Sequence, residues 1–354
     1  MSALIVYFFL ACLLLPASFI ASHKKASLTD NVFLWLAIFV AALIIGLRWD
    51  PLNEDFLNYY NLVAGKVPDY ALERVELIPK YLVIFLQYFK LPAFLWFVFM
   101  ALVQLIFIVL TASKNIKQIL PWMFLLYFYS LFSLSLIITR QLVALTIVLY
   151  AYTFIEKRKM IPYLFYIFFA YCFHRTALVC LPLYWLIPFI RLNSVKLQFV
   201  IVILFLVFGD SLIATFWEYA PIDQEVFRYA SYADREFDYG AKSGLGVLSN
   251  YIRYSIIILY SPKLKEKFKS TDISIFYTLL FIQICLYKSM MNDLAFSRII
   301  MYFSIADLVV TGYLLHYLLC SKNEFNRFVH VAIVSVLLIT IIYQAYKSPA
   351  WAFV

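Results

Sequence analysis

The chain has 354 residues, of which 65 % are hydrophobic and only 14 % are charged, whereas an ordinary soluble domain is about half apolar. A soluble fold of this length could not bury so much apolar surface, so the composition excludes a soluble globular protein. The formal net charge is +9, but the basic residues lie in short loops between apolar segments. No nucleic-acid partner is therefore expected.

Long apolar runs predict helices that cross a membrane, because an outer-membrane barrel would show short alternating segments instead. We expect an all-α, polytopic transmembrane helical bundle, with residues 1–354 forming a single integral membrane domain. The first span lacks the basic start and the cleavage site of a signal peptide, so it is expected to be retained. About twelve spans are expected, at 2–20, 31–47, 92–112, 119–138, 141–156, 160–174, 176–190, 197–209, 247–261, 273–290, 298–319 and 328–346.

The charges of alternating loops predict the orientation of these spans. One set of loops carries 15 of the 29 Lys and Arg residues but only 5 of the 20 Asp and Glu residues. An excess of Lys and Arg marks cytoplasmic loops, so this set is predicted to face the cytoplasm and both termini to lie outside. The basic residues of the set are Lys24, Lys25, Lys114, Lys117, Lys157, Arg158, Lys159, Arg191, Lys196, Lys263, Lys265, Lys267, Lys269, Lys322 and Arg327.

Two longer segments fall on the opposite, external side. The first, 48–91, includes an amphipathic stretch at 76–90 that we expect to lie in the interface, because a further span there would break the alternation of the loops. The second, 210–246, mixes acidic, basic and aromatic residues. Since neither segment is long enough for a soluble domain of useful size, chemistry is expected between these loops and the outer helix ends.

Arginine gathers at external helix ends, while lysine dominates the cytoplasmic loops. Charges at membrane depth are costly and often mark sites, although a snorkelling interfacial cation explains any single one equally well. The planar guanidinium suits phosphate oxygens, so the set predicts a binding site for a lipid-linked phosphate or pyrophosphate. The candidate ligands are Arg48, Arg140, Arg253 and Arg298.

Asp50, Asp55 and His174 are candidate proton-transfer groups at the same external ends. The alternative is that the two carboxylates are solvated loop residues and that the histidine is interfacial or buried. Asp307 lies deep in a predicted span and is expected to pair internally, with a proton relay as the alternative. The sequence has no phosphate-binding loop, zinc-protease motif or serine-hydrolase motif, and neither a metal nor a cofactor is expected.

Four short motifs resemble the EpsG-like branch of bacterial polysaccharide polymerases. Residues 46–50 (Gly-Leu-Arg-Trp-Asp), followed by Asp55 and Tyr59-Tyr60, resemble the first external motif of that family. Residues 139–144 resemble its Arg-Gln-x-x-Ala motif, 173–178 its His-x-Ser/Thr-Ala-Leu motif, and 298–303 a later Arg-x-x-x-Tyr-Phe element. An acid ahead of the interfacial helix is matched by Glu76, with Glu73 as the alternative.

The resemblance implies a fold and a reaction. Wzy-type O-antigen polymerases belong to this group, and their fold relatives are the GT-C-like glycosyltransferases and the O-antigen ligases. The implied function is polymerisation of undecaprenyl-pyrophosphate-linked oligosaccharide repeat units at the outer face of the bacterial inner membrane. The arginines would stabilise the leaving pyrophosphate, and Asp50, Asp55 or His174 would take the acceptor proton. Substrate contacts are expected from Tyr59, Tyr60, Gln141, Arg175 and Tyr302.

Other functions remain open from the sequence, among them a membrane acyltransferase and a purely structural scaffold, which would leave the one-sided Arg and His residues unexplained. A flippase for the same lipid-linked sugar would need cations in both leaflets, whereas the arginines lie on one side. A ligase-like transferase that attaches the glycan to another carrier is chemically close to a polymerase. The expected partners are the lipid bilayer, the lipid-linked oligosaccharide and a separate chain-length regulator protein.

Overall fold

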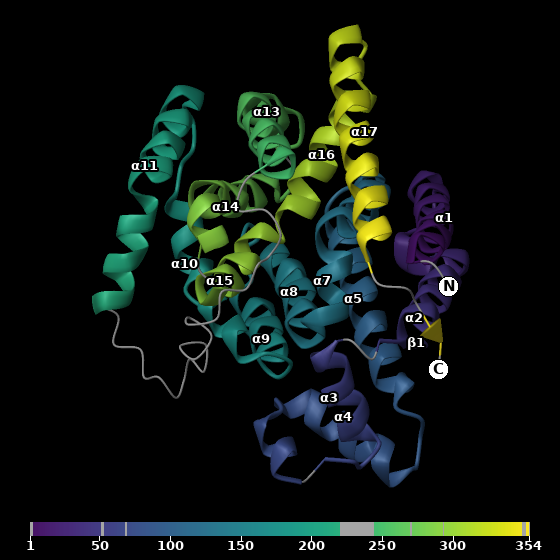
Figure 1. Ribbon diagram of the computed structural model, residues 1–354. Coiled ribbons are helices and arrows are strands. Elements are labelled where there is room, and N and C mark those ends of the chain that lie inside the picture. Colours follow the sequence, from purple (N-terminus) through teal and green to yellow (C-terminus); the bar gives the residue numbers. More distant parts are fainter. Residues whose placement is uncertain are drawn as a thin grey trace. The chain divides into compact units, whose positions relative to one another are not determined.

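The computed structural model describes residues 3–50, 53–67, 69–219, 244–269, 271–292, 294–348 and 352–353. Over these ranges the chain is almost entirely helical (Figure 1), which confirms the all-α prediction. Two compact units are present, Met1–Tyr184 with Thr311–Val354 and Trp185–Val310. Each unit is described by itself, and the expected single membrane domain stays a prediction.

The first unit is built around helix α5. Helix α5 packs against α2 and α8, α8 packs against α9, and α1 packs against α2, α6 and α17. Strands β1 and β2 pair antiparallel, with Arg48 opposite Phe353 and Trp49 opposite Ala352. The elements are α1 (Ala3–His23), α2 (Val32–Gly46), β1 (Arg48–Trp49), α3 (Glu54–Val63), α4 (Leu77–Tyr88), α5 (Phe94–Lys114), α6 (Leu120–Leu126), α7 (Phe132–Ile137), α8 (Thr139–Ala151), α9 (Met160–Tyr171), α17 (Glu324–Lys347) and β2 (Ala352–Phe353).

Asparagine caps fix the start of three of these helices. The Asn31 Oδ1 accepts from Leu34 N at 3.0 Å, and the Asn53 Oδ1 accepts from Phe56 N at 3.1 Å. The Asn323 side chain accepts from Phe325 N at 2.8 Å. Each bond satisfies a backbone N–H that has no partner within its own helix. The asparagines at these positions therefore determine where α2, α3 and α17 begin.

Helices α2 and α5 approach closely at Gly46, so Gly46→Ala is expected to destabilise the protein. A Cβ at Gly46 would lie 2.6 Å from the Val98 backbone nitrogen and 2.8 Å from the Val98 Cα. Separating the helices to relieve this overlap loses packing, and we expect a cost of about 1–3 kcal/mol. Thermal aggregation of the detergent-solubilised protein measures it. Gly246→Ala is the control, because a Cβ there meets none of the described atoms within 4 Å. Equal melting of both variants would contradict the prediction.

The second unit contains α11 (Val195–Tyr219), α13 (Leu245–Lys267), α14 (Ile273–Asn292) and α15 (Leu294–Ser304). Helix α14 packs against α11, α13 and α15. Helix α16 (Asp307–Leu319) begins in this unit and continues into the first. The predicted span 298–319 is thus two helices, separated by the residues between Ser304 and Asp307. The predicted span 176–190 likewise consists of short pieces, with α10 (Leu183–Leu186) between two 3₁₀ turns.

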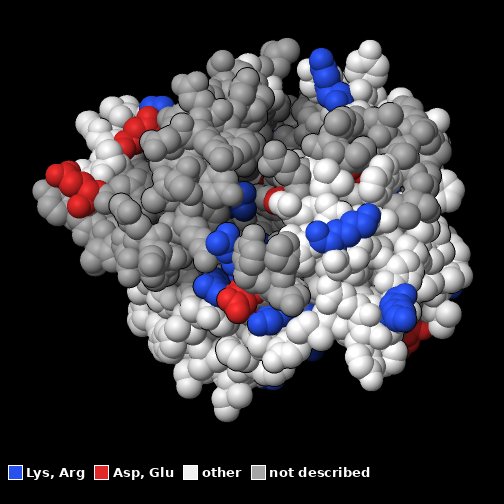
Figure 2. All heavy atoms as spheres, turned by 60° about the horizontal axis from the view of Figure 1, so that its bottom comes forward, with Lys and Arg blue, Asp and Glu red and all other residues white. Residues whose placement is uncertain are grey.

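Six helical segments among the described residues are long and apolar enough to cross a membrane. This identifies a helical membrane protein, whereas the full number of about twelve spans stays a prediction. The six are Ala3–His23, Phe94–Lys114, Lys117–Ile137, Val195–Leu212, Phe296–Leu319 and Glu324–Lys347. On the face that Figure 2 brings forward, Lys, Arg, Asp and Glu side chains are few among the uncharged ones.

The structure describes most of the first predicted external segment but only the ends of the second. The amphipathic stretch 76–90 does contain a helix, α4, whose Tyr81 and Tyr88 are exposed. Of the second segment, 210–246, residues 220–243 lie outside the described part of the chain. The functional site can therefore be built only from the first segment and from the helix ends.

Candidate functional site

Helix α4 begins beside the chain that leads to His174. The Ile78 N–H, in the first turn of α4, donates to the Cys172 carbonyl oxygen at 3.0 Å. His174 itself has an extended backbone, with φ −157° and ψ 121°, between α9 and a 3₁₀ turn at Arg175–Cys180. This connection places Glu76, the N-cap residue of α4, next to the histidine.

The Glu76 carboxylate joins the two motif residues that the sequence analysis singled out. Its Oε1 lies 3.2 Å from the His174 Nδ1, and its Oε2 accepts from the Arg140 Nη1. The side chains of Glu76 and His174 are each 9 % exposed, and that of Arg140 is 24 % exposed. Charge-assisted hydrogen bonds between buried side chains such as these are stronger than those at the surface. A carboxylate at a helix N-terminus is also favoured by the helix dipole.

The contact with Glu76 sets the state of the His174 ring. A carboxylate can only accept, so the Nδ1 carries the hydrogen of this bond. In the neutral ring the Nε2 is then left as an acceptor, which is the arrangement that a general base requires. Glu76 thus fixes the orientation and the tautomer of the His174 ring.

The Arg140 guanidinium also packs on an aromatic ring, that of Tyr59. The guanidinium carbon lies 5.1 Å from the centre of the Tyr59 ring, within the range of a cation–π interaction. The Tyr59 ring stacks on Trp96, with centroids 4.4 Å apart and an interplanar angle of 9°. Trp96 is fully buried, so it anchors Tyr59 in turn. Arg140 keeps donors beyond its bond to Glu76, since a guanidinium has five N–H groups.

The other predicted residues of the first unit differ in their exposure and in the elements that carry them. Asp50 is half-buried in the loop after β1, and Asp55 is exposed in the first turn of α3. Tyr60 contacts the Trp49 ring at 4.9 Å. Gln141 is buried beside Arg140 in α8, and Arg175 is exposed.

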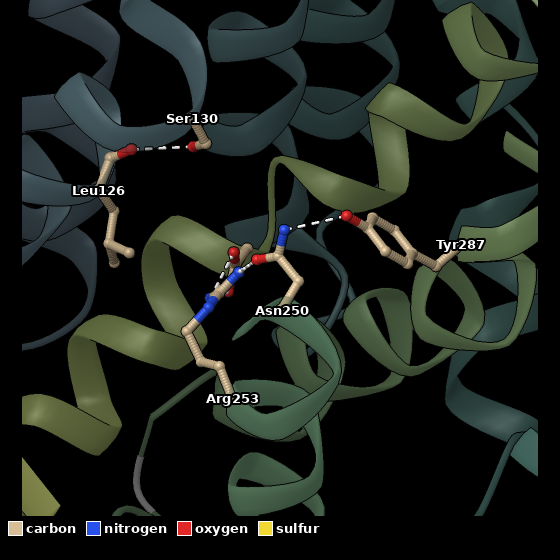
Figure 3. Close-up of polar contacts among 6 residues, drawn as sticks. Leu126, Ser130, Asn250, Arg253 and Tyr287 are labelled. Atoms are coloured by element: carbon tan, nitrogen blue, oxygen red, sulfur yellow. Dashed lines mark hydrogen bonds and ion pairs between the residues drawn. The ribbon is translucent and has the colours of Figure 1, made fainter. Parts of the chain in front are cut away.

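The second unit holds the remaining predicted residues. The Arg253 Nη1 lies 2.6 and 2.7 Å from the two carboxylate oxygens of Asp307, and both side chains are buried. Internal pairing of Asp307 is therefore confirmed. In Figure 3 the Arg253 guanidinium also points toward Asn250, whose amide donates to the Tyr287 hydroxyl at 2.9 Å.

Arg298 and Tyr302 lie one turn apart on α15. Arg298 is half-buried and Tyr302 is fully buried. Their predicted contacts with substrate stay predictions, as does the pyrophosphate contact of Arg253.

Glu76 is the site residue that sequence reasoning did not include among its candidates. Glu76 lies just before an amphipathic helix, but the sequence also allows Glu73 as the acid of this motif. The partners of Glu76 are 64 and 98 positions further along the chain, so nothing local distinguishes the two acids. The fold decides between them, because Glu73 is exposed.

The comparison with protein families agrees with the motifs. A model of the EpsG family matches residues 31–353, which contain the whole Glu76–Arg140–His174 cluster. No curated protein and no solved structure matches the chain.

Proposed function

The chain belongs to the EpsG family, and we propose that it polymerises undecaprenyl-pyrophosphate-linked oligosaccharide repeat units at the outer face of the bacterial inner membrane. Family membership supports a glycosyltransferase-like polysaccharide polymerase. The observation that carries the proposal further is the bridge from Glu76 to Arg140 and His174, which combines a candidate base with a candidate phosphate ligand. The outward orientation is supported by the distribution of Lys and Arg in the loops.

The proposed reaction transfers a glycan from its lipid carrier to a sugar hydroxyl. The acceptor oxygen attacks the anomeric carbon and forms the new glycosidic bond, while the bond from that carbon to the pyrophosphate oxygen breaks. The electron pair leaves with the pyrophosphate, and the His174 Nε2 takes the acceptor proton. Asp50 and Asp55 remain alternative bases, and the link from His174 through Glu76 to Arg140 favours the histidine.

Arg140 has the role of stabilising the charge that develops on the leaving pyrophosphate. Its partial exposure leaves donors within reach of a ligand, and its bond to Glu76 fixes its direction. Arg298 and Arg253 are the further proposed pyrophosphate ligands. Tyr59, Tyr60, Gln141, Arg175 and Tyr302 are proposed to contact the substrate. The bilayer and a chain-length regulator protein are the proposed partners.

Deletion of the gene tests this function. We expect a deletion strain to export lipid-linked single repeat units and to lack long chains, and the purified protein to extend such units in vitro. Gel separation of the surface glycan, with radiolabelled lipid-linked units followed on both sides of the membrane, measures both results. Units retained in the cytoplasmic leaflet would indicate a flippase instead. Normal polymer that is not attached to its final carrier would indicate a ligase.

A further inference from the structure

The guanidinium of Arg48 is enclosed by the first unit rather than presented to a ligand. Arg48 is 3 % exposed, and its guanidinium carbon lies 5.3 Å from the Phe56 ring centre and 5.9 Å from that of Phe97. Its backbone is paired with Phe353 across the β1–β2 ladder. Burial lowers the pKa of the Arg48 guanidinium to about 10, an effect that nearby Asp50 opposes, so the group stays charged at neutral pH.

Within the described part of the chain, the charged end of Arg48 donates to one backbone group, the Leu136 carbonyl. The Arg48 Nη2 donates to this oxygen, and the Asn53 Nδ2 donates to it at 3.2 Å. The carbonyl lies in the last turn of α7, where the chain turns at Ile138 with φ −97° and ψ 49° before α8 begins. Carbonyls at the end of a helix lack partners within it, so two side-chain donors replace the missing helical bond.

This break determines where Arg140 lies, because Arg140 is the second residue of α8 and follows Leu136 by four positions. Asn53 connects the same point to α3, since its Oδ1 caps that helix while its Nδ2 holds the Leu136 oxygen. Tyr59, against which the Arg140 guanidinium packs, is on α3. The two hydrogen bonds from Arg48 and Asn53 to the Leu136 oxygen are called the clamp below. The clamp holds the start of α8, which carries Arg140, against the start of α3, which carries Tyr59.

We propose that Arg48 and Asn53 are positioning residues, which hold the α7–α8 break so that Arg140 can act on the pyrophosphate. The proposal rests on the proposed function and assigns Arg48 a different role from direct pyrophosphate binding. Positioning acts through Arg140 in the transition state, so loss of the clamp lowers kcat with little change in KM. If Arg48 bound the pyrophosphate directly, its replacement would instead raise the KM for the lipid-linked unit. The donor for such a contact would be the buried Arg48 Nε, which has no hydrogen-bond partner among the described residues.

Asn53→Ser is the sharpest variant. Serine keeps a side-chain oxygen that caps α3 but lacks the donor that reaches Leu136. With purified protein and synthetic lipid-linked repeat units, we expect kcat to fall between about tenfold and 100-fold at nearly unchanged KM. Arg48→Lys, which keeps one charged donor, is expected to be less affected than Arg48→Met. Asn58→Ser is the control, because Asn58 is an exposed residue of α3. This variant should behave as wild type.

Two results would overturn the proposal. One is a raised KM at unchanged kcat in the Arg48 variants, which would show direct binding. The other is an additive loss when Asn53→Ser is combined with Arg140→Lys, because a residue that acts through Arg140 loses its effect once Arg140 is changed.

Hydrogen exchange gives a readout that does not depend on activity. Amides of residues 136–142 are expected to exchange faster in Asn53→Ser and Arg48→Met than in wild type, and unchanged exchange there would also overturn the proposal. If wild-type protein extends no lipid-linked unit while these amides respond as expected, the proposed function fails and the clamp stands.

Discussion

Replacing Glu76 with glutamine is expected to reduce polymer formation by about 100-fold to 10,000-fold, the range that a general base contributes. Glutamine has the same size but no charge, so the bonds to Arg140 and His174 lose their ionic partner. His174 is then no longer held with its Nε2 as the acceptor, and Arg140 loses its anchor. Glycan gels of a complemented deletion strain, together with immunoblots of the membranes, measure activity and protein level.

Glu73→Gln is the matched control for Glu76→Gln. Glu73 is exposed and lies three residues earlier, so its replacement should leave chain length as in wild type. Residues that act as a unit show non-additive effects, and we expect Glu76→Gln with His174→Ala to be no worse than the more severe single variant. Long chains in the Glu76→Gln strain would eliminate the carboxylate as a positioning group. The reverse result, with Glu73→Gln inactive, would move the site to the other acid.

The second large effect concerns stability. Asp307→Ala is expected to destabilise the protein by about 3–5 kcal/mol, because it leaves the buried Arg253 guanidinium without its counter-charge. Both carboxylate oxygens are within 2.7 Å of the Arg253 Nη1, and Arg253 is 5 % exposed. Unfolding of the detergent-solubilised protein in increasing SDS measures the loss. Unchanged unfolding would show that the pair contributes nothing measurable.

A control and a double variant separate stability from function at Arg253. Lys288→Met is the control and breaks the ion pair of Lys288 with Asp210. The two side chains of this pair are 40 % and 43 % exposed, and an exposed ion pair contributes about 0–1 kcal/mol to stability. Arg253→Met with Asp307→Leu removes both charges and is expected to recover most of the stability. If activity recovers with stability, Arg253 serves only to join α13 to α16. If the stable double variant makes no polymer, Arg253 keeps its proposed role on the pyrophosphate.

Most helices could be predicted from the sequence because their cause is local. In lipid every backbone N–H and C=O group must be satisfied within its own segment, so a long apolar run predicts a helix whatever its neighbours are. The predicted segments 2–20 and 92–112 correspond to α1 and α5 within a few residues. The interruption between Ser304 and Asp307 was not predicted, since the run of apolar residues continues through it.

The sequence by itself determined that this is a helical membrane protein with motifs of the EpsG family. Composition, apolar run length and the loop charges are properties that a linear chain displays directly. Only the tertiary structure decided that Glu76, and not Glu73, joins Arg140 to His174, that Asp307 pairs with Arg253, and that Arg48 reaches Leu136. Side-chain partners depend on which helices pack together, and these pairs join positions 54 to 98 residues apart.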